Sequence, residues 1–410
     1  METREDRLRE MIETLADLTD TPGEGVNRFS YGENDKKARE YLTSICRKLG
    51  LSVRTDGGGN VFARLEGSLP QAPPVMTGSH IDSVKNGGRF DGIVGSVAAL
   101  EAVRVMVEHD HRPKHPIDVV FFAEEEGSNF QVPVLGSKLL VGKLGISDLK
   151  GIKNHQGETA YEVMKKAGIE PDRITGDVIK PDQVKAMIEL HIEQSVRLDV
   201  EKKPIGIVIG IAGLNWLKVT LKGCTNHAGA TPMGLRQDPM VGAAKIISEI
   251  PKIAGSVSDT AVATVGNLEV APNIPNAIPG EVTFVVDVRD ITEEGIAGVV
   301  GKIGEATEKY ARQEKLTWET EIIATTVPIK VEDYMVDMMT GCATEADLEY
   351  LLMPSGAIHD SNYIAEVTDV GMIFVPSVDG RSHVKDEFTK WSDIKAGADL
   401  LLKTLMEIAS

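Results

Sequence analysis

Four short apolar runs in this chain each lead into a segment with a histidine or acidic residues, and this pattern limits the fold more than any other feature. The runs lie in "PPVMTGSHID", "IDVVFFAEEEG", "AMIELHIEQ" and "GMIFVPSVDGRSH". Strands this apolar are usually buried on both faces, as in a sheet covered by helices. In open α/β sheets, functional side chains gather at the carboxyl ends of strands. The sequence therefore predicts an α/β fold with a polar site at one edge of its sheet.

The chain has 410 residues, which is long enough for two domains. From about Leu214 to Val327, a strand–helix–strand–strand–helix–strand pattern predicts a small α+β sandwich inserted into the larger domain. We therefore expect a catalytic domain formed by residues 1–213 and 328–410. Residues 214–327 are expected to form the inserted domain.

Composition excludes several classes of partner. A net charge of −18 argues against nucleic acid, because a polyanion would be repelled. No apolar run approaches the roughly 20 residues of a membrane span, so no membrane partner is expected. Three widely spaced cysteines favour a reducing compartment without disulfides, which predicts a cytoplasmic protein.

A glycine-rich loop, "GSHIDSVKNGGRFDGIVG", joins the first of the apolar runs to a helical segment. It holds one histidine and two aspartates, which are side chains able to bind metal ions. Glycines allow the backbone to fold tightly, so that His80 and Asp91 can reach one point.

Six motifs, in this order along the chain, resemble those of the N-carbamoyl-L-amino-acid amidohydrolases and allantoate amidohydrolases. They are "GSHIDSVKNGGRFDGIVG", "EEEGSNF", "ELHIEQ", "NHAGATPMGLRQDP", "PNAIPGEVTFVVDVRD" and "GRSHVKDE". These enzymes belong to the M20-type dinuclear metallopeptidase clan, which also contains aminoacylases and carboxypeptidases. The resemblance implies a mixed-sheet catalytic domain, an inserted lid and dimerisation domain, and a homodimer.

The resemblance further implies two divalent metal ions in each subunit. His80 and His191 would bind one ion, Glu126 and His383 would bind the other, and Asp91 would bridge both. Three imidazoles and two carboxylates suit Zn²⁺ or Mn²⁺, and also Co²⁺ or Ni²⁺, so the physiological metal stays open.

Two further acids are expected to act beside the ions. Glu125 matches the family's general base, which takes a proton from water acidified by the cations and passes it to the leaving nitrogen. Glu124 makes the register ambiguous by one position, and Gly127, which follows the pair in the family, resolves it. Asp82 is expected to accept the second N–H of the His80 imidazole. A solvated acidic turn is the alternative for the three glutamates.

Four residues are expected to contact the substrate. His227 resembles the family histidine that reaches across a dimer to polarise the scissile carbonyl; its alternative is a packed histidine beside a turn. Asn276 and Arg289 match residues that hold a substrate carboxylate, which suits the planar fork of an arginine. A surface ion pair is the alternative for Arg289. Gln194 would contact the carbamoyl group. Whether His227 acts within or across subunits stays open.

Several positions depart from the family pattern and leave the substrate open. Leu214 and Asn215 replace a Gln-Arg pair, which removes a charged donor and counts against allantoate. Ile358 stands where a glycine lets the chain approach the ligand. Ser195 replaces a glycine and Lys385 replaces a proline.

We therefore expect a hydrolase of linear amides that cleaves carbon–nitrogen bonds other than peptide bonds. Its substrate would be a small N-carbamoyl amino acid or related ureide that carries a carboxylate. An aminoacylase or dipeptidase-like peptide hydrolase is one alternative, against which His191 and Gln194 argue. An allantoate amidohydrolase is another, and a non-catalytic binding protein, against which Glu125 argues, is the third. The side chain accepted, the stereochemical preference and the pathway stay open.

Overall fold

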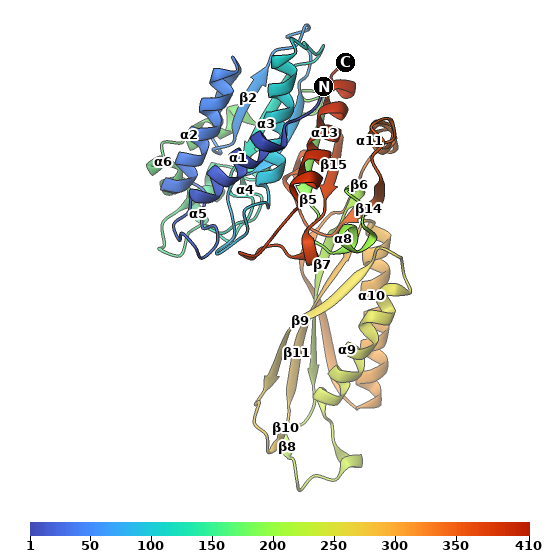
Figure 1. Ribbon diagram of the computed structural model, residues 1–410. Coiled ribbons are helices and arrows are strands. Elements are labelled where there is room, and N and C mark those ends of the chain that lie inside the picture. The colour runs from blue at the N-terminus through green and yellow to red at the C-terminus, as the bar shows by residue number, and fades with distance from the viewer. The chain divides into compact units, whose positions relative to one another are not determined.

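The computed structural model describes residues 1–410, which form two compact units. Unit 1 comprises Met1–Ile209, Val331–Met353 and His359–Ser410, whereas unit 2 comprises Gly210–Lys330 and Pro354–Ile358. The expected insertion of residues 214–327 falls inside unit 2. The sequence pattern did not indicate that the short segment 354–358 groups with it. Both chain termini, blue and red in Figure 1, belong to unit 1.

Unit 1 is built around a mixed sheet. Its strands are β1 (Ser52–Thr55), β2 (Val61–Leu65), β3 (Val75–His80), β4 (Ile117–Phe122), β5 (Ala186–Ile192), β6 (Ile205–Ile211), β14 (Tyr350–Ser355) and β15 (Val370–Val375). They are ordered β1-β2-β4-β3-β5-β15-β6, and β14 also pairs with β6. The four neighbours β4, β3, β5 and β15 run parallel to one another, whereas β2 and β6 join them antiparallel.

Helices cover this sheet. They are α1 (Glu5–Asp17), α2 (Glu33–Lys48), α3 (Ile93–Glu108), α4 (Leu135–Leu140), α5 (Ile146–Gly151), α6 (Ala160–Lys166), α7 (Ile174–Asp177), α8 (Arg197–Glu201), α11 (Asp333–Glu345), α12 (Asp360–Ile364) and α13 (Trp391–Ile408). Helices α1, α3 and α13 pack on one another, and α3, α13 and α12 each contact β5. None of the helices combines the length and the apolar character that a membrane span requires.

The parallel strands explain the apolar runs in the sequence. Every residue of β3, β4, β5 and β15 is buried, because the sheet is covered on both faces at this point. The register places His80 opposite Phe122 at the ends of β3 and β4, and His191 opposite Phe374 near the ends of β5 and β15. The four expected polar segments therefore begin at one edge of one sheet.

Unit 2 contains the six expected elements, which are β7 (Gly213–Lys222), α9 (Pro239–Gly255), β9 (Val262–Ala271), β11 (Glu281–Asp290), α10 (Glu293–Gln313) and β12 (Thr317–Thr326). It also contains three short strands, β8 (Asn226–His227), β10 (Ala277–Ile278) and β13 (Ile329–Lys330), the last of which pairs with β6. The antiparallel sheet has the order β12-β7-β11-β9, and α9 and α10 share a core with it. A two-stranded ribbon of β8 and β10 was not predicted.

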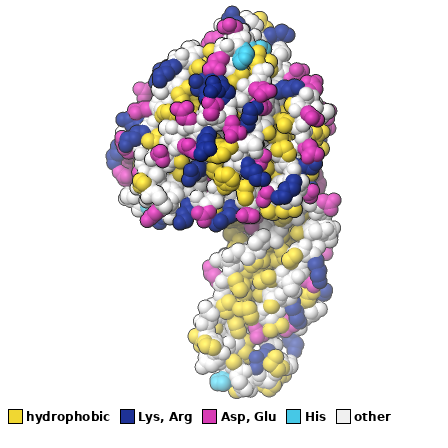
Figure 2. Space-filling model, viewed as in Figure 1, with side chains coloured by type: hydrophobic (Ala, Val, Ile, Leu, Met, Phe, Trp, Pro, Cys, Tyr) yellow, Lys and Arg dark blue, Asp and Glu magenta, His cyan; other side chains and the backbone are white.

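One face of the unit 2 sheet is left open in the single chain. On β11, Phe284 and Val286 are buried in the core shared with the helices, whereas Asp287 and Arg289 alternate onto the other side. Large apolar side chains stay exposed on this unit, among them Val262, Leu268, Trp216, Ile322 and Ile323. Figure 2 shows hydrophobic side chains gathered along unit 2, over its strands. Such a patch is typical of a surface that another molecule covers.

We predict that Gly95→Ala destabilises unit 1, because α3 approaches the sheet too closely for a side chain. A Cβ at Gly95 would lie 2.0 Å from the Leu190 carbonyl oxygen and 2.9 Å from the Ser79 Cβ. Overpacking of this kind costs about 1–3 kcal/mol in the free energy of unfolding, which urea denaturation measures.

The control is Gly341→Ala in α11, where a Cβ would meet no atom within 4 Å. Removal of a helical glycine there should raise stability by about 0.5–1 kcal/mol. Equal free energies of unfolding for the two variants would contradict this account of how α3 packs.

Candidate metal centre

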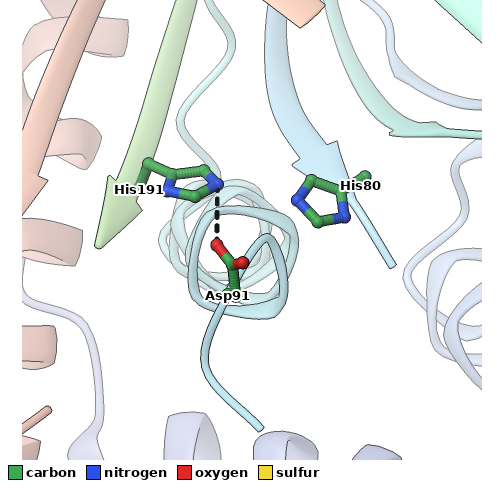
Figure 3. A group of neighbouring side chains, drawn as sticks. All are labelled: His80, Asp91 and His191. Carbon is green, nitrogen blue, oxygen red and sulfur yellow. Dashed lines mark ion pairs between the residues drawn. The ribbon is translucent and has the colours of Figure 1, made fainter. Parts of the chain in front are cut away.

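Two histidines and one aspartate converge at the carboxyl edge of the unit 1 sheet. His80 ends β3, His191 lies in β5, and Asp91 precedes α3. In Figure 3 the two rings flank the Asp91 carboxylate. His191 Nε2 lies 3.4 Å from Asp91 Oδ1, and one ligand atom from each residue lies within 4.8 Å of the others. All three side chains are buried.

The glycine-rich loop makes this approach possible. Gly92, between Asp91 and the first residue of α3, has a φ of 66°. A Cβ at this position would lie 2.4 Å from the His80 ring. Only glycine accepts both this backbone conformation and this contact. The part of the loop that holds Asp91 can therefore turn into α3 directly against His80.

Asp91 also belongs to a second group of possible ligands, with Glu126 and His383. His383 Nε2 lies 3.0 Å from Asp91 Oδ2 and 3.6 Å from Glu126 Oε2. The His383 side chain is 48% exposed, whereas the two carboxylates are buried. The Asp91 carboxylate is thus shared by the two groups of possible ligands. Its Oδ1 faces His191 of the first group, and its Oδ2 faces His383 of the second.

The three consecutive glutamates face different surroundings. Glu124 Oε1 accepts the backbone N–H groups of Asn129 at 2.8 Å and of Phe130 at 3.0 Å. Glu125 Oε2 instead lies 3.7 Å from His80 Nε2, and Glu126 lies near His383. The geometry therefore separates Glu124 from the other two glutamates.

Asp82 differs in part from the expectation. The acceptor nearest to His80 Nδ1 is the Asp82 backbone carbonyl at 3.1 Å, with the carboxylate Oδ1 farther away at 3.6 Å. The carboxylate accepts the backbone N–H of Glu125 at 3.2 Å on Oδ1 and that of Glu126 at 3.1 Å on Oδ2. Asp82 therefore orients His80 through its backbone and holds the glutamate turn through its side chain.

Gln194 lies directly against Asp91. Its Nε2 donates to Asp91 Oδ1 at 3.0 Å and Oδ2 at 3.2 Å, and lies 3.3 Å from His383 Nε2. The buried Oε1 makes no hydrogen bond. The side chain is thus at the centre, as a group that contacts a bound substrate must be.

Burial and mutual repulsion dominate the titration of the two glutamates. Burial raises the pKa of Glu125 well above its usual value, against the opposing charge of His80, and the charges of Glu126 and Asp82 raise it further. Burial and the charge of Asp91 likewise raise the pKa of Glu126. The protein alone supplies too little positive charge for these acids to ionise easily.

The opposite shifts occur where acid and imidazole meet. Burial opposes ionisation of Asp91, but the hydrogen bond with His383 and the charge of His191 lower its pKa below the usual range. Burial alone would lower the pKa of His80, but Glu125 raises it well above the usual value. The centre therefore favours positive charge next to its carboxylates.

These residues fit divalent cations. The buried Nε2 of His191 makes no hydrogen bond, although a buried polar atom normally has a partner. Imidazole nitrogens and carboxylate oxygens are ligands that Zn²⁺, Mn²⁺, Co²⁺ and Ni²⁺ accept. The five residues predicted as metal ligands are brought together here: His80, Asp91, Glu126, His191 and His383.

Two residues at this centre were given no role by the sequence analysis. Glu387 accepts hydrogen bonds from both the Asp91 and the His383 segments. The His359 ring packs edge-on against His191, with 4.6 Å between ring centroids. Glu387 ends the quoted motif "GRSHVKDE", but the sequence neighbourhood of neither residue indicates what its side chain contacts.

In unit 2, the β8–β10 ribbon brings His227 and Asn276 together. His227 pairs with Ala277, and the backbone N–H of Ala228 donates to the Asn276 carbonyl at 3.0 Å. His227 Nδ1 accepts the N–H groups of Gly229 and Ala230, both at 3.1 Å. In the neutral imidazole the other nitrogen, Nε2, then carries the proton and is a donor. His227 is exposed, so it is not a packed core histidine.

Arg289 lies far from that ribbon within one chain. The ribbon continues beyond the Glu281 end of β11 (Figure 1), whereas Arg289 is eight residues farther along the strand. At a rise of about 3.4 Å per residue this is roughly 27 Å. Arg289 and Asn276 of one chain therefore cannot hold the same small carboxylate.

Arg289 forms the ion pair that was its alternative, but it keeps donors free. Nε and Nη2 donate to Asp287 at 2.9 and 3.1 Å, and Nη1 donates to the Gly356 carbonyl at 2.7 Å. A guanidinium has five N–H donors, so one N–H on each terminal nitrogen remains for a ligand.

Comparisons with known proteins agree over the whole chain. Residues 76–407 match Peptidase family M20/M25/M40. An N-carbamoyl-L-amino acid amidohydrolase of Geobacillus stearothermophilus is 39% identical over 98% of this chain and 98% of its own length. An allantoate amidohydrolase of Escherichia coli is 31% identical over 98% of this chain and 97% of its own length. A ureidoglycolate hydrolase of Arabidopsis thaliana is 34% identical over 98% of this chain and 86% of its own length. An amidase of the hydantoinase/carbamoylase family from Burkholderia multivorans has the same fold, with a TM-score of 0.94 and 34% identity over 100% and 98%.

We predict that Asp82→Asn weakens divalent-ion binding about 10–100-fold, the usual effect of losing a group that orients metal ligands. An asparagine keeps the shape but offers one acceptor where the N–H groups of Glu125 and Glu126 need two. Competition with a chromophoric chelator measures the affinity. Asp118→Asn removes an ion pair between Asp118 on β4 and Arg64 on β2, and as the control it should leave the ion affinity unchanged. Unaltered affinity in Asp82→Asn would contradict the role of its carboxylate.

Proposed function

We infer that this chain, which belongs to Peptidase family M20/M25/M40, is a metal-dependent hydrolase of carbon–nitrogen bonds other than peptide bonds in linear amides. The observation that carries the inference is the sharing of the buried Asp91 between two groups of possible metal ligands. The substrate proposed is a small N-carbamoyl amino acid, because relatives of that activity match this chain along its full length.

Two divalent ions would be held by the two groups. His80 and His191 would supply the imidazoles for one ion, and Glu126 and His383 would hold the other. Asp91 is proposed as the bridging ligand because its two oxygens face different histidines. When bound, the ions would polarise the substrate carbonyl and make water more acidic.

Glu125 is proposed as the general base. It is a buried carboxylate that accepts no backbone N–H group, unlike its neighbour Glu124. Its elevated pKa suits a group that takes a proton from the attacking water and later donates it to the leaving nitrogen. Asp82 would keep Glu125 in place through its hydrogen bond to the Glu125 backbone.

Substrate contacts are proposed for both units. Gln194 would contact the carbamoyl group, since its amide already lies beside Asp91. The two remaining N–H groups of Arg289 match the two oxygens of a substrate carboxylate. His227 would donate its Nε2 proton to the carbonyl oxygen as negative charge develops there, and Asn276 would contribute beside it.

A homodimer with composite sites is proposed, and the separation of these residues supports it. Arg289 and the His227–Asn276 ribbon lie roughly 27 Å apart along one chain, as estimated from the strand rise. A second copy of the chain would supply the ribbon to the site that uses Arg289. The open, apolar face and edges of the unit 2 sheet support an interface of this kind.

Allantoate is the second candidate substrate because an allantoate amidohydrolase is among the relatives. Leu214 and Asn215 argue against it, since neither is a charged donor. Asn215 also lies in phase with the buried Leu217, on the side of β7 opposite to the exposed Trp216. We therefore rank N-carbamoyl amino acids first.

We predict that N-carbamoyl amino acids are hydrolysed with a higher kcat/KM than allantoate, ureidoglycolate, N-acyl amino acids or dipeptides. Ammonia or amine release measures the rates on protein reconstituted with Zn²⁺, Mn²⁺, Co²⁺ or Ni²⁺. Exhaustive chelation should abolish turnover, and return of the ion should restore it. Preference for N-acyl amino acids or dipeptides, or full activity after chelation, would refute the proposal.

We predict that Glu125→Gln lowers kcat by about 10²–10⁴-fold while ion binding persists, because the amide keeps the shape but cannot take up the proton. Glu124→Gln is the matched control, since an amide oxygen can still accept the two N–H groups that Glu124 Oε1 accepts. Steady-state kinetics at saturating ion concentration compare the two. A large loss of kcat in Glu124→Gln with none in Glu125→Gln would show that Glu124, and not Glu125, is the general base.

A further inference from the structure

One carboxylate joins the two loops that carry Asp91 and His383. Glu387 Oε1 accepts the backbone N–H groups of Phe90 at 2.9 Å and of Asp91 at 3.0 Å. Its Oε2 accepts the Ser382 hydroxyl at 3.1 Å and the His383 backbone N–H at 3.3 Å. The residue is 3% exposed, so water competes little for these hydrogen bonds.

The connection matters because His383 has little other support. It lies between Gly380 and the start of α13, outside any helix or strand, and its φ of 59° is in the left-handed region. Its side chain is 48% exposed, in contrast to the buried His80 and His191 on their strands. Regular secondary structure therefore does not hold the His383 loop in place.

When ionised, the Glu387 carboxylate matches the donors at this position. It only accepts hydrogen bonds, and each of its oxygens has two lone pairs. Four donors on two loops are thereby satisfied by two oxygens. A glutamine in the same place would offer one oxygen and one NH₂ group, which would face two donors.

We propose that Glu387 is a positioning residue that holds the Asp91 and His383 loops at one fixed separation. By this means it sets the affinity for the ion that Asp91, Glu126 and His383 share. This inference rests on the proposed function. Glu387 makes no contact with substrate in this account and acts only through the backbone of two ligands.

The test is Glu387→Gln, with ion binding measured by chelator competition and by the visible absorption of bound Co²⁺. We expect one ion to bind about 10–100-fold more weakly, the effect usual for a lost support of a metal ligand. The Co²⁺ spectrum of that ion should change more than the spectrum of the other ion, which shares only Asp91 with it. Activity should return with excess ion, with the KM for substrate unchanged.

Glu101→Gln is the matched control, because it makes the same change at a buried glutamate of unit 1 away from the ligand loops. Glu101 accepts the Arg4 backbone N–H at 3.2 Å and pairs with Arg7 at 3.1 Å. It should lower stability without altering ion affinity. Ion affinity of wild-type strength in Glu387→Gln, or an equal loss in Glu101→Gln, would overturn the proposal.

A second variant covers the case in which Glu387→Gln does not fold. Ser382→Ala removes one of the four donors, and we expect a smaller weakening of the same ion; no change would overturn the proposal. If the wild-type chain bound no divalent ion, the proposed function would fail, and the role of Glu387 with it. If the wild-type chain bound divalent ions and Glu387→Gln bound them equally well, only the positioning role would be refuted.

Discussion

Charge compensation inside a buried volume is the constraint on which the rest of this structure depends. Asp91, Glu125 and Glu126 are held together with little water, and an isolated buried charge costs on the order of several kcal/mol. The neighbouring imidazoles compensate Asp91 but leave the two glutamates with elevated pKa values. Such a site is stable either with protons or with cations, and the family to which the chain belongs is one of metal-dependent hydrolases.

The acids around this volume divide into two kinds. Asp82, Glu124 and Glu387 accept backbone N–H groups, so each of them holds a loop in place. The remaining acids accept few or none and face the histidines. The acids that bind backbone N–H groups thus hold the loops, and Asp91, Glu125 and Glu126 remain available for ion binding and proton transfer. The parallel strands β4, β3, β5 and β15 bring both kinds to one edge, and the loops then determine which acid faces inward.

The fold class and the convergence at the sheet edge could be predicted because fully buried strands leave nearly continuous apolar runs in the sequence. The contacts of Glu387 could not be predicted, because four donors from two loops meet it only after the chain has folded. The sequence also did not indicate how far apart Asn276 and Arg289 lie. The two residues are close in sequence, but β11 extends between them. The assignment of segment 354–358 to unit 2 depends on contacts that form only in the folded chain, and no local pattern indicates it.

The extended form of β11 has a consequence for how such chains can change. A strand has a fixed rise, so the gap between its two ends depends on the number of residues and hardly at all on their identity. Substitutions on the open face of the sheet change the side chains that are presented there but preserve the distance between the two ends of β11. Removing two residues from the strand and its partners would shorten it by about 7 Å. We therefore expect the length of this segment to be more restricted than its composition.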